Sequence, residues 1–192
     1  MPPRRFPLVA AALALAVATA TGCTEANGTD GKNYVTDDGV VIQIPVSERD
    51  DPVEVSGKTL TGEPLDLADR RGSVVVVNVW WTGCGPCRAE APLLVDASDE
   101  LAGDGTIVGI NIRDSSPETA LAFERGFDVP FPSLYDPGST QLLNFPAPFN
   151  PRDIPSTVVL DREGRVAALV RGAVPSKLTL LDLVEEVATE DG

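Results

Sequence analysis

The sequence predicts an α/β sandwich with a mixed central sheet, and three patterns support this fold class. Residues 74–80 form a nearly continuous apolar, β-branched run, which is typical of a strand buried on both faces. Helical and strand-like segments then alternate along the chain. Near its end, two apolar runs flank a short polar turn, which predicts an antiparallel hairpin, and a helix follows. Elements in this order are typical of a sheet covered by helices.

Residues 1–22 have the features of a bacterial signal peptide. Arg4 and Arg5 provide a basic start, and residues 8–18 are an apolar stretch of eleven residues. Eleven are too few to span the roughly 30 Å hydrocarbon core of a bilayer, which takes about 20. We therefore expect cleavage, with an uncleaved membrane anchor as the alternative. A twin-arginine signal is disfavoured because the residues after Arg5 fit that motif poorly.

The end of this segment, Ala20-Thr21-Gly22-Cys23, resembles a bacterial lipobox, in which the cysteine becomes the lipidated first residue of the mature chain. Ala20 departs from the usual Leu. Lipid attachment at Cys23 would explain the odd number of cysteines, three in all. We expect residues 23–51 to be a polar tether with one short strand near 40–44, and residues 52–192 to form the domain.

A helix is predicted from Pro86 to Leu101, directly after the 74–80 strand. Proline is favoured near a helix start because its missing N–H needs no partner there. The three- and four-residue spacing of its apolar residues predicts one inward face. That face consists of Cys87, Ala91, Leu94, Ser98 and Leu101.

The remaining elements follow the same patterns. We expect a strand at 106–112, a helix at 117–125 and short elements within 133–143. The hairpin pairs 156–160 with 165–170 across the turn at 161–164. The final helix covers 177–189, and its apolar stripe is Leu178, Leu181, Val184 and Val187.

Composition excludes several classes of function. The net charge of −14 argues against nucleic-acid binding, which needs clustered Lys and Arg. The chain has no histidine, which excludes Ser-His-Asp and Cys-His nucleophile pairs and His-ligated metal sites. We expect no metal or other cofactor.

Cys84 and Cys87 lie at the predicted strand-to-helix junction and form a candidate redox pair. The helix N-terminus favours a thiolate at Cys84, and thiol pKa values in such settings fall to about 3.5–7.5. Cys87 lies close enough to resolve a mixed disulfide. A structural disulfide is disfavoured because so small a loop stabilises little. A zinc site would need two more ligands than this domain offers.

The stretch from Asn78 to Pro92, NVWWTGCGPCRAEAP, resembles the active-site segment of the TlpA/ResA branch of the thioredoxin superfamily. These are extracytoplasmic, usually membrane-tethered thiol–disulfide oxidoreductases. The resemblance covers about 52–190 and includes the 57–65, 109–114 and 154–157 segments. It implies a thioredoxin-like three-layer sandwich with an N-terminal extension and a strand–helix insertion at 113–140.

The resemblance also implies roles for single residues. Gly85 and Pro86 separate the catalytic cysteines, Glu90 lies near them, and Pro155 is cis and faces them, with the Ile154 backbone pairing with substrate. A buried carboxylate at Glu90 would raise a nearby thiol pKa and relay its proton. A solvated helix charge is the alternative for Glu90, and a plain turn is the alternative for Pro155.

One position departs from this family. Gly83 stands where the family usually has Trp, directly before the first cysteine. We expect either that Trp81 covers the site instead or that the sulfur of Cys84 is more open. Trp80 and Trp81 are otherwise expected to pack in the core or at its rim.

The sequence thus predicts a reductase of disulfides in exported proteins, such as apocytochrome c, on the outer face of a bacterial membrane. A membrane thiol-electron donor would supply it, as the resemblance implies. Gly-Pro between the cysteines favours reduction. An oxidant or isomerase on the same fold is the alternative, and Cu(I) binding by both thiolates is a weaker one.

Overall fold

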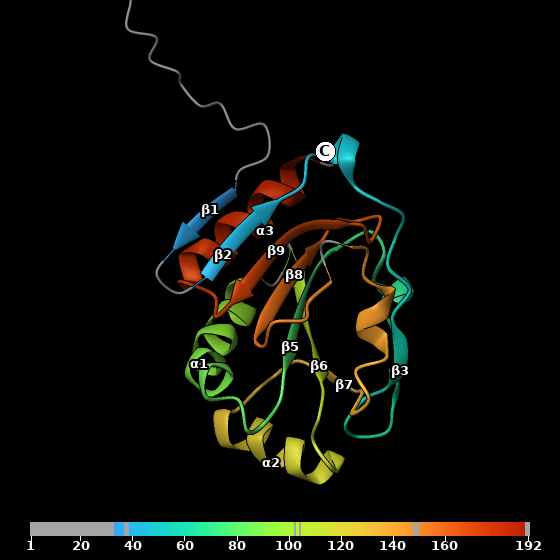
Figure 1. The fold of residues 1–192 in the computed structure, drawn as a ribbon, viewed down its shortest axis with the longest axis vertical. Helices are drawn as coiled ribbons and strands as arrows, with labels where there is room; N and C mark the ends of the chain where they lie inside the picture. The colour runs from blue at the N-terminus through green and yellow to red at the C-terminus, as the bar shows by residue number, and fades with distance from the viewer. Residues whose placement is uncertain (1–32, 37–38, 102, 104, 148–149, 191–192) are drawn as a thin grey trace, which may run out of the picture.

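The computed structural model describes residues 33–36, 39–101, 103, 105–147 and 150–190 (Figure 1). The signal peptide and Cys23 lie outside these residues. The strands are β1 (Asn33–Thr36), β2 (Gly39–Gln43), β3 (Ser56–Lys58), β4 (Pro64–Asp66), β5 (Val74–Trp80), β6 (Gly105–Asn111), β7 (Ser133–Tyr135), β8 (Ser156–Leu160) and β9 (Val166–Gly172). The helices are α1 (Gly85–Glu100), α2 (Pro117–Phe127) and α3 (Lys177–Glu190), with 3-10 turns η1 (Val46–Glu48), η2 (Leu67–Arg70) and η3 (Gln141–Asn144).

Seven of the described strands form a mixed sheet in the order β1-β2-β9-β8-β5-β6-β7. β5 lies inside the sheet, parallel to β6 on one side and antiparallel to β8 on the other. Both faces of β5 are buried along its whole length, which explains its unbroken apolar run. β8 and β9 form the expected hairpin. The mixed α/β fold is therefore confirmed.

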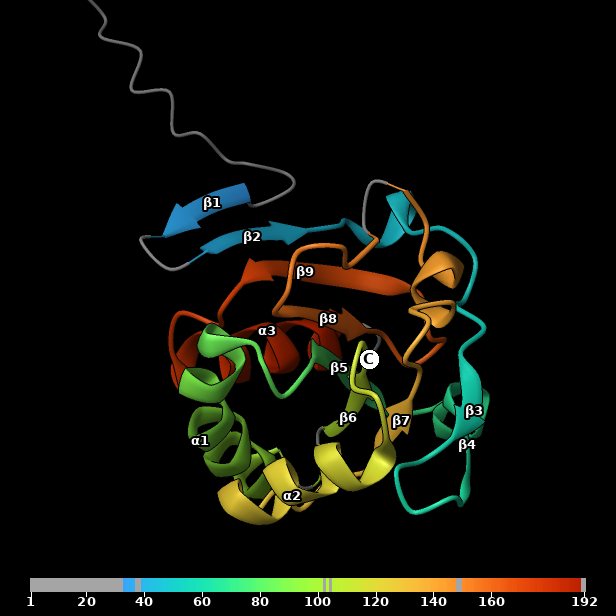
Figure 2. The same ribbon diagram turned by 60° about the horizontal axis from the view of Figure 1, so that its bottom comes forward.

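The two faces of the sheet are covered differently (Figures 1 and 2). α1 and α3 pack on one face, through a cluster that includes Leu94 and Leu180. The opposite face packs against segments around β3, β4 and η3, including Leu65 and Phe145. α2 lies beside α1, at the end of the sheet where β5 and β6 finish. Residues 113–140 thus contribute α2 and β7, in the region where an insertion is expected.

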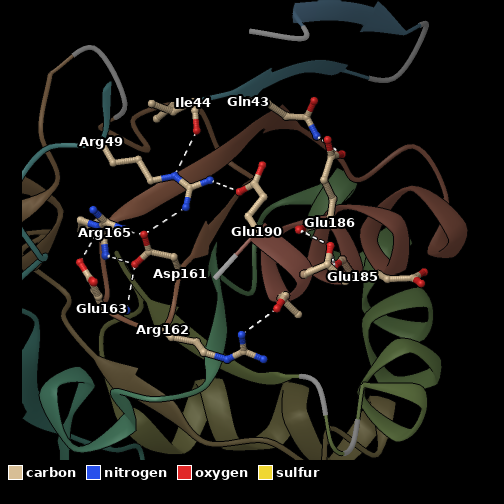
Figure 3. A network of polar contacts seen from close by, with 12 residues as sticks. Gln43, Ile44, Arg49, Asp161, Arg162, Glu163, Arg165, Glu185, Glu186 and Glu190 are labelled. Atoms are coloured by element: carbon tan, nitrogen blue, oxygen red, sulfur yellow. Dashed lines mark hydrogen bonds and ion pairs between the residues drawn. The ribbon is translucent and has the colours of Figure 1, made fainter. Parts of the chain in front are cut away.

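The segment expected to be a polar tether with one short strand near 40–44 contributes two strands to the sheet, and β2 is the expected one. β2 pairs with β9, and β1 pairs with β2, so the sheet begins well before residue 52. Arg49, whose side chain is 1% exposed, contacts Asp161 and Glu190 and joins this segment to the β8–β9 turn and the end of α3 (Figure 3). No helix among the described residues is long and apolar enough to cross a bilayer.

The inward faces of two helices differ from the sequence prediction. In α1 the buried residue is Ala97 rather than Ser98, whose hydroxyl donates to the Val95 carbonyl oxygen. In α3 Leu180 and Leu183 are buried, whereas Leu178 is 66% exposed. The apolar residues of α3 lie on more than one side of the helix, so their spacing alone did not identify the buried stripe.

Candidate active site

Cys84 and Cys87 form a disulfide at the start of α1, with their Cα atoms 5.2 Å apart. Cys84 is the N-cap of the helix, and its Sγ accepts a hydrogen bond from the Cys87 N–H at 3.1 Å. Pro86 occupies the first turn, where its missing N–H has no cost. The N-terminal position and this N–H both stabilise negative charge on Cys84 Sγ once the disulfide is reduced.

Trp81 packs directly on Gly83. A Cβ atom at Gly83 would lie 2.2 Å from Cζ3 of the Trp81 ring, so no larger residue fits there with the ring in place. Trp81 and Ile154 both pack against the apolar cluster that contains the two cysteines. Cys84 itself, a member of this cluster, is only 6% exposed.

Glu90 is buried one turn after Cys87 and is 4% exposed. Its Oε1 accepts a hydrogen bond from Asn78 Nδ2 at 3.0 Å, and its Oε2 accepts one from the Val174 N–H at 3.0 Å. Burial raises the pKa of Glu90 to about 7, and the two hydrogen bonds oppose this rise only in part. A carboxyl with this pKa exchanges its proton near neutral pH.

A small cavity lies behind the disulfide. It has a volume of ≈ 20 Å³, close to that of one water molecule, and both Cys87 and Asn78 line it. Asn78 also donates to Thr157 Oγ1 at 3.1 Å. Asn78 therefore borders the cavity next to Cys87 and also binds the carboxylate of Glu90.

The peptide bond between Ile154 and Pro155 is cis. The Pro155 carbonyl oxygen accepts a hydrogen bond from the Gly172 N–H at 3.0 Å, at the end of the β8–β9 hairpin. Ile154 packs against the cluster around Cys84 and Cys87. The structure therefore brings together Cys84, Cys87, Gly85, Pro86, Glu90 and Ile154, with Pro155 next to Ile154.

Sequence reasoning assigned no role to Asp114, which supports the loop before Cys84. Asp114 is 5% exposed and accepts hydrogen bonds from the Thr82 hydroxyl at 2.6 Å, the Thr82 N–H at 3.1 Å and Asn111 Nδ2 at 2.7 Å. Tyr135 donates to its carbonyl oxygen. An acidic residue three positions after the end of a buried strand was the available signal, because β5 and β6 end at the edge of the sheet that holds the cysteines.

Within the part of the chain that the structure describes, no group of three or more Cys, Asp or Glu side chains is placed to hold a metal ion.

Comparison with known proteins agrees with this geometry. The Redoxin family matches residues 34–185. The thioredoxin-like protein YneN of Bacillus subtilis is 30% identical over 70% of this chain and 78% of its own length. The thiol–disulfide oxidoreductase ResA of the same organism is 26% identical over 69% of this chain and 72% of its own length.

Solved structures show the same fold. A secreted thiol–disulfide isomerase from Corynebacterium glutamicum superimposes with a TM-score of 0.70 and 30% identity, covering 83% of this chain and 99% of that one. A DsbF homologue from Corynebacterium diphtheriae gives a TM-score of 0.67 and 34% identity, covering 76% of this chain and 92% of that one.

Proposed function

The chain belongs to the Redoxin family and is a thiol–disulfide oxidoreductase of the ResA/DsbE type, and from this we propose that Cys84 and Cys87 carry out its exchange reaction as a reductant outside the cytoplasm. The observation that carries the proposal is the buried pair at the start of α1, with Glu90 one turn away.

The reaction begins with the reduced pair. The Cys84 thiolate attacks a substrate disulfide, a Cys84–substrate S–S bond forms, and one substrate sulfur leaves as a thiolate. Cys87 then loses its proton and attacks Cys84 Sγ, which releases the second substrate thiolate and closes the Cys84–Cys87 disulfide. Glu90, with a pKa of about 7, is the group that accepts the Cys87 proton. The backbone of Ile154, beside cis-Pro155, holds the substrate chain in an extended form.

Two further features complete the proposal. A lipid on Cys23 would hold the domain at the outer face of the membrane, and a membrane thiol-electron donor would reduce the disulfide again. If Cys23→Ser does not release the protein from membrane fractions, the anchor is wrong and the redox chemistry is unaffected.

The direction of electron flow separates reductant from oxidant or isomerase. The C. glutamicum relative is named an isomerase, which favours the second candidate. We expect a reduction potential closer to that of thioredoxin, about −270 mV, than to that of DsbA, about −120 mV. A value near −120 mV, measured by equilibration with thiol buffers, would identify an oxidant.

Substrate choice needs a separate assay. A peptide with a Cys-x-x-Cys-His disulfide, the haem-attachment sequence of apocytochrome c, should be reduced faster than insulin when dithiothreitol regenerates the enzyme. Equal rates would leave the reductase without this substrate preference. Cu(I) binding by the two thiolates predicts instead that added Cu(I) blocks alkylation of both.

A further inference from the structure

An open hollow of ≈ 320 Å³ lies between α1 and α2, directly beside the redox loop. Thr82 and Arg88 border it on the side of the cysteines, and Thr119, Phe123 and Phe127 border it on the side of α2. Arg88 is in the first turn of α1, and its N–H donates to the Cys84 carbonyl oxygen at 3.1 Å. The hollow therefore begins within a few residues of the sulfur that meets the substrate.

Arg88 is held by aromatic rings and not by a carboxylate. Its Cζ lies 5.5 Å from the ring centroid of Phe123 and 5.4 Å from that of Phe127. These contacts engage the face of the guanidinium and leave the N–H groups at its edge available. Among the described residues no carboxylate forms an ion pair with Arg88, whereas Arg49 and Arg165 are both paired with Asp161.

The lining of the hollow has a charge opposite to that of the whole chain. The chain carries 29 acidic and 15 basic residues, yet no acidic side chain in the described part of the chain borders the hollow. The hydroxyl of Thr119 also borders the hollow, whereas the Thr82 hydroxyl donates its proton to Asp114 at 2.6 Å. A planar guanidinium already fixed against two rings loses little freedom on binding a carboxylate, which it can hold through two parallel hydrogen bonds.

We propose that this hollow binds an acidic side chain of the substrate protein, within about three residues of the cysteine that bonds to Cys84. An extended chain advances about 3.3–3.6 Å per residue, so a neighbouring Asp or Glu reaches Arg88 from that cysteine. The proposal rests on the proposed exchange at Cys84 and adds a preference for acidic sequences around the substrate disulfide.

A single-turnover assay tests this preference without an electron donor. Peptides with one cysteine are coupled to thionitrobenzoate through a disulfide and reacted with reduced Cys87→Ser protein. Cys84 thiolate forms a disulfide with the peptide sulfur, the original S–S bond breaks, and thionitrobenzoate leaves as a coloured thiolate. Peptides with Glu or Gln at each of three positions on either side of the cysteine are compared.

We expect a Glu/Gln rate ratio of about twofold to fivefold at one or more positions, as for an exposed ion pair. The ratio should fall to about 1 in Arg88→Gln and at about 1 M salt, where the screening length is about 3 Å. Arg88→Glu should instead favour a Lys peptide. Taking the ratio within each variant cancels any effect of Arg88 on the Cys84 thiolate itself.

Arg125→Gln is the matched control, since it removes the same charge from an exposed position on α2 that does not line the hollow. A ratio of 1 with Arg88 intact, or an unchanged ratio in Arg88→Gln, would overturn the proposal. An equal loss in Arg125→Gln would also overturn it, because the effect would then come from the overall charge of the protein rather than from the hollow. If the Glu/Gln ratio is seen but the wild-type protein reduces no protein disulfide, the proposed reducing function is wrong. The binding of an acidic side chain in the hollow is then still supported.

Discussion

Two buried carboxylates, Asp161 and Glu90, lie in opposite electrostatic surroundings. Asp161 Oδ2 lies 3.1 Å from Arg49 Nη1 and 2.8 Å from Arg165 Nε (Figure 3). Glu90 has hydrogen bonds only from the neutral donors of Asn78 and Val174 among the described residues. Two cations offset the burial of Asp161, whereas none of the described cations offsets that of Glu90, and the pKa of Glu90 rises to about 7.

We infer that this difference separates a structural carboxylate from the one proposed to take part in the reaction. Asp161 holds three chain segments together: the stretch after β2, the β8–β9 turn and, through Arg49, the end of α3. Glu90 carries a proton that can leave near neutral pH, and it lies one turn from Cys87. Burial alone does not indicate function, because the cations and the hydrogen bonds around the buried group together decide how far burial raises its pKa.

The largest expected effect is at Asp161. Asp161→Asn leaves Arg49 and Arg165 without their shared anion, and we expect the free energy of unfolding to fall by about 3–5 kcal/mol. Urea denaturation measures it. Glu163→Gln is a control in the same turn, because Glu163 also contacts Arg165 but its side chain is 67% exposed, and it should cost less than about 1 kcal/mol. Similar losses of unfolding free energy in the two variants would contradict the structural role assigned to Asp161.

The next effect concerns how the free energy of unfolding depends on pH. The folded state keeps the Glu90 proton up to about pH 7, whereas the unfolded chain loses it near 4.5, so wild-type stability falls between these values. At about 1.4 kcal/mol per pKa unit, Glu90→Gln should gain up to about 3 kcal/mol on wild type above pH 7 and nothing below pH 4.5. Asn78 can turn its amide so that its oxygen faces the amide introduced at position 90, since the Thr157 hydroxyl is able to donate. A difference independent of pH would contradict a raised pKa.

A smaller effect is expected at Asp114, a third buried carboxylate, which also has only neutral donors among the described residues. Asp114→Asn keeps the shape and most hydrogen bonds, so we expect a loss of about 1–2 kcal/mol in the free energy of unfolding. The looser Thr82 loop should also change the alkylation rate of Cys84. If stability falls but that rate stays the same, Asp114 supports the fold and does not position the redox loop.

The smallest effect is on the thiols of the reduced protein. Cys84 should alkylate faster than Cys87 at pH 7, because Cys84 is the helix N-cap and receives the Cys87 N–H. Glu90→Gln removes a negative charge near the pair, so the apparent thiol pKa values should fall and the alkylation profile should shift to lower pH. Faster alkylation of Cys87 would reverse the assigned roles, and superimposable profiles would return Glu90 to a structural role.

Local patterns in the sequence predicted the parts of the structure that depend on neighbouring residues. The buried strand at 74–80, the helix after Cys84 and the hairpin of 156–160 with 165–170, observed as β8 and β9, belong to this group. Contacts between distant residues left no such pattern. The Val174 N–H that binds Glu90 comes from 84 residues away, and any residue other than proline could supply it. Arg49 in the expected tether gave no sign that Asp161, 112 residues later, was its partner.

The titration of Glu90 itself tests the central claim most directly. Carbon-13 NMR of the side-chain carboxyls in oxidised, glutamate-labelled protein follows each Glu separately, and Glu90→Gln identifies the signal by its loss. The account predicts a midpoint at about pH 7. A midpoint near the ordinary 4.5 would contradict it, because the Glu90 carboxylate would then be too weak a base to take the proton of Cys87 effectively.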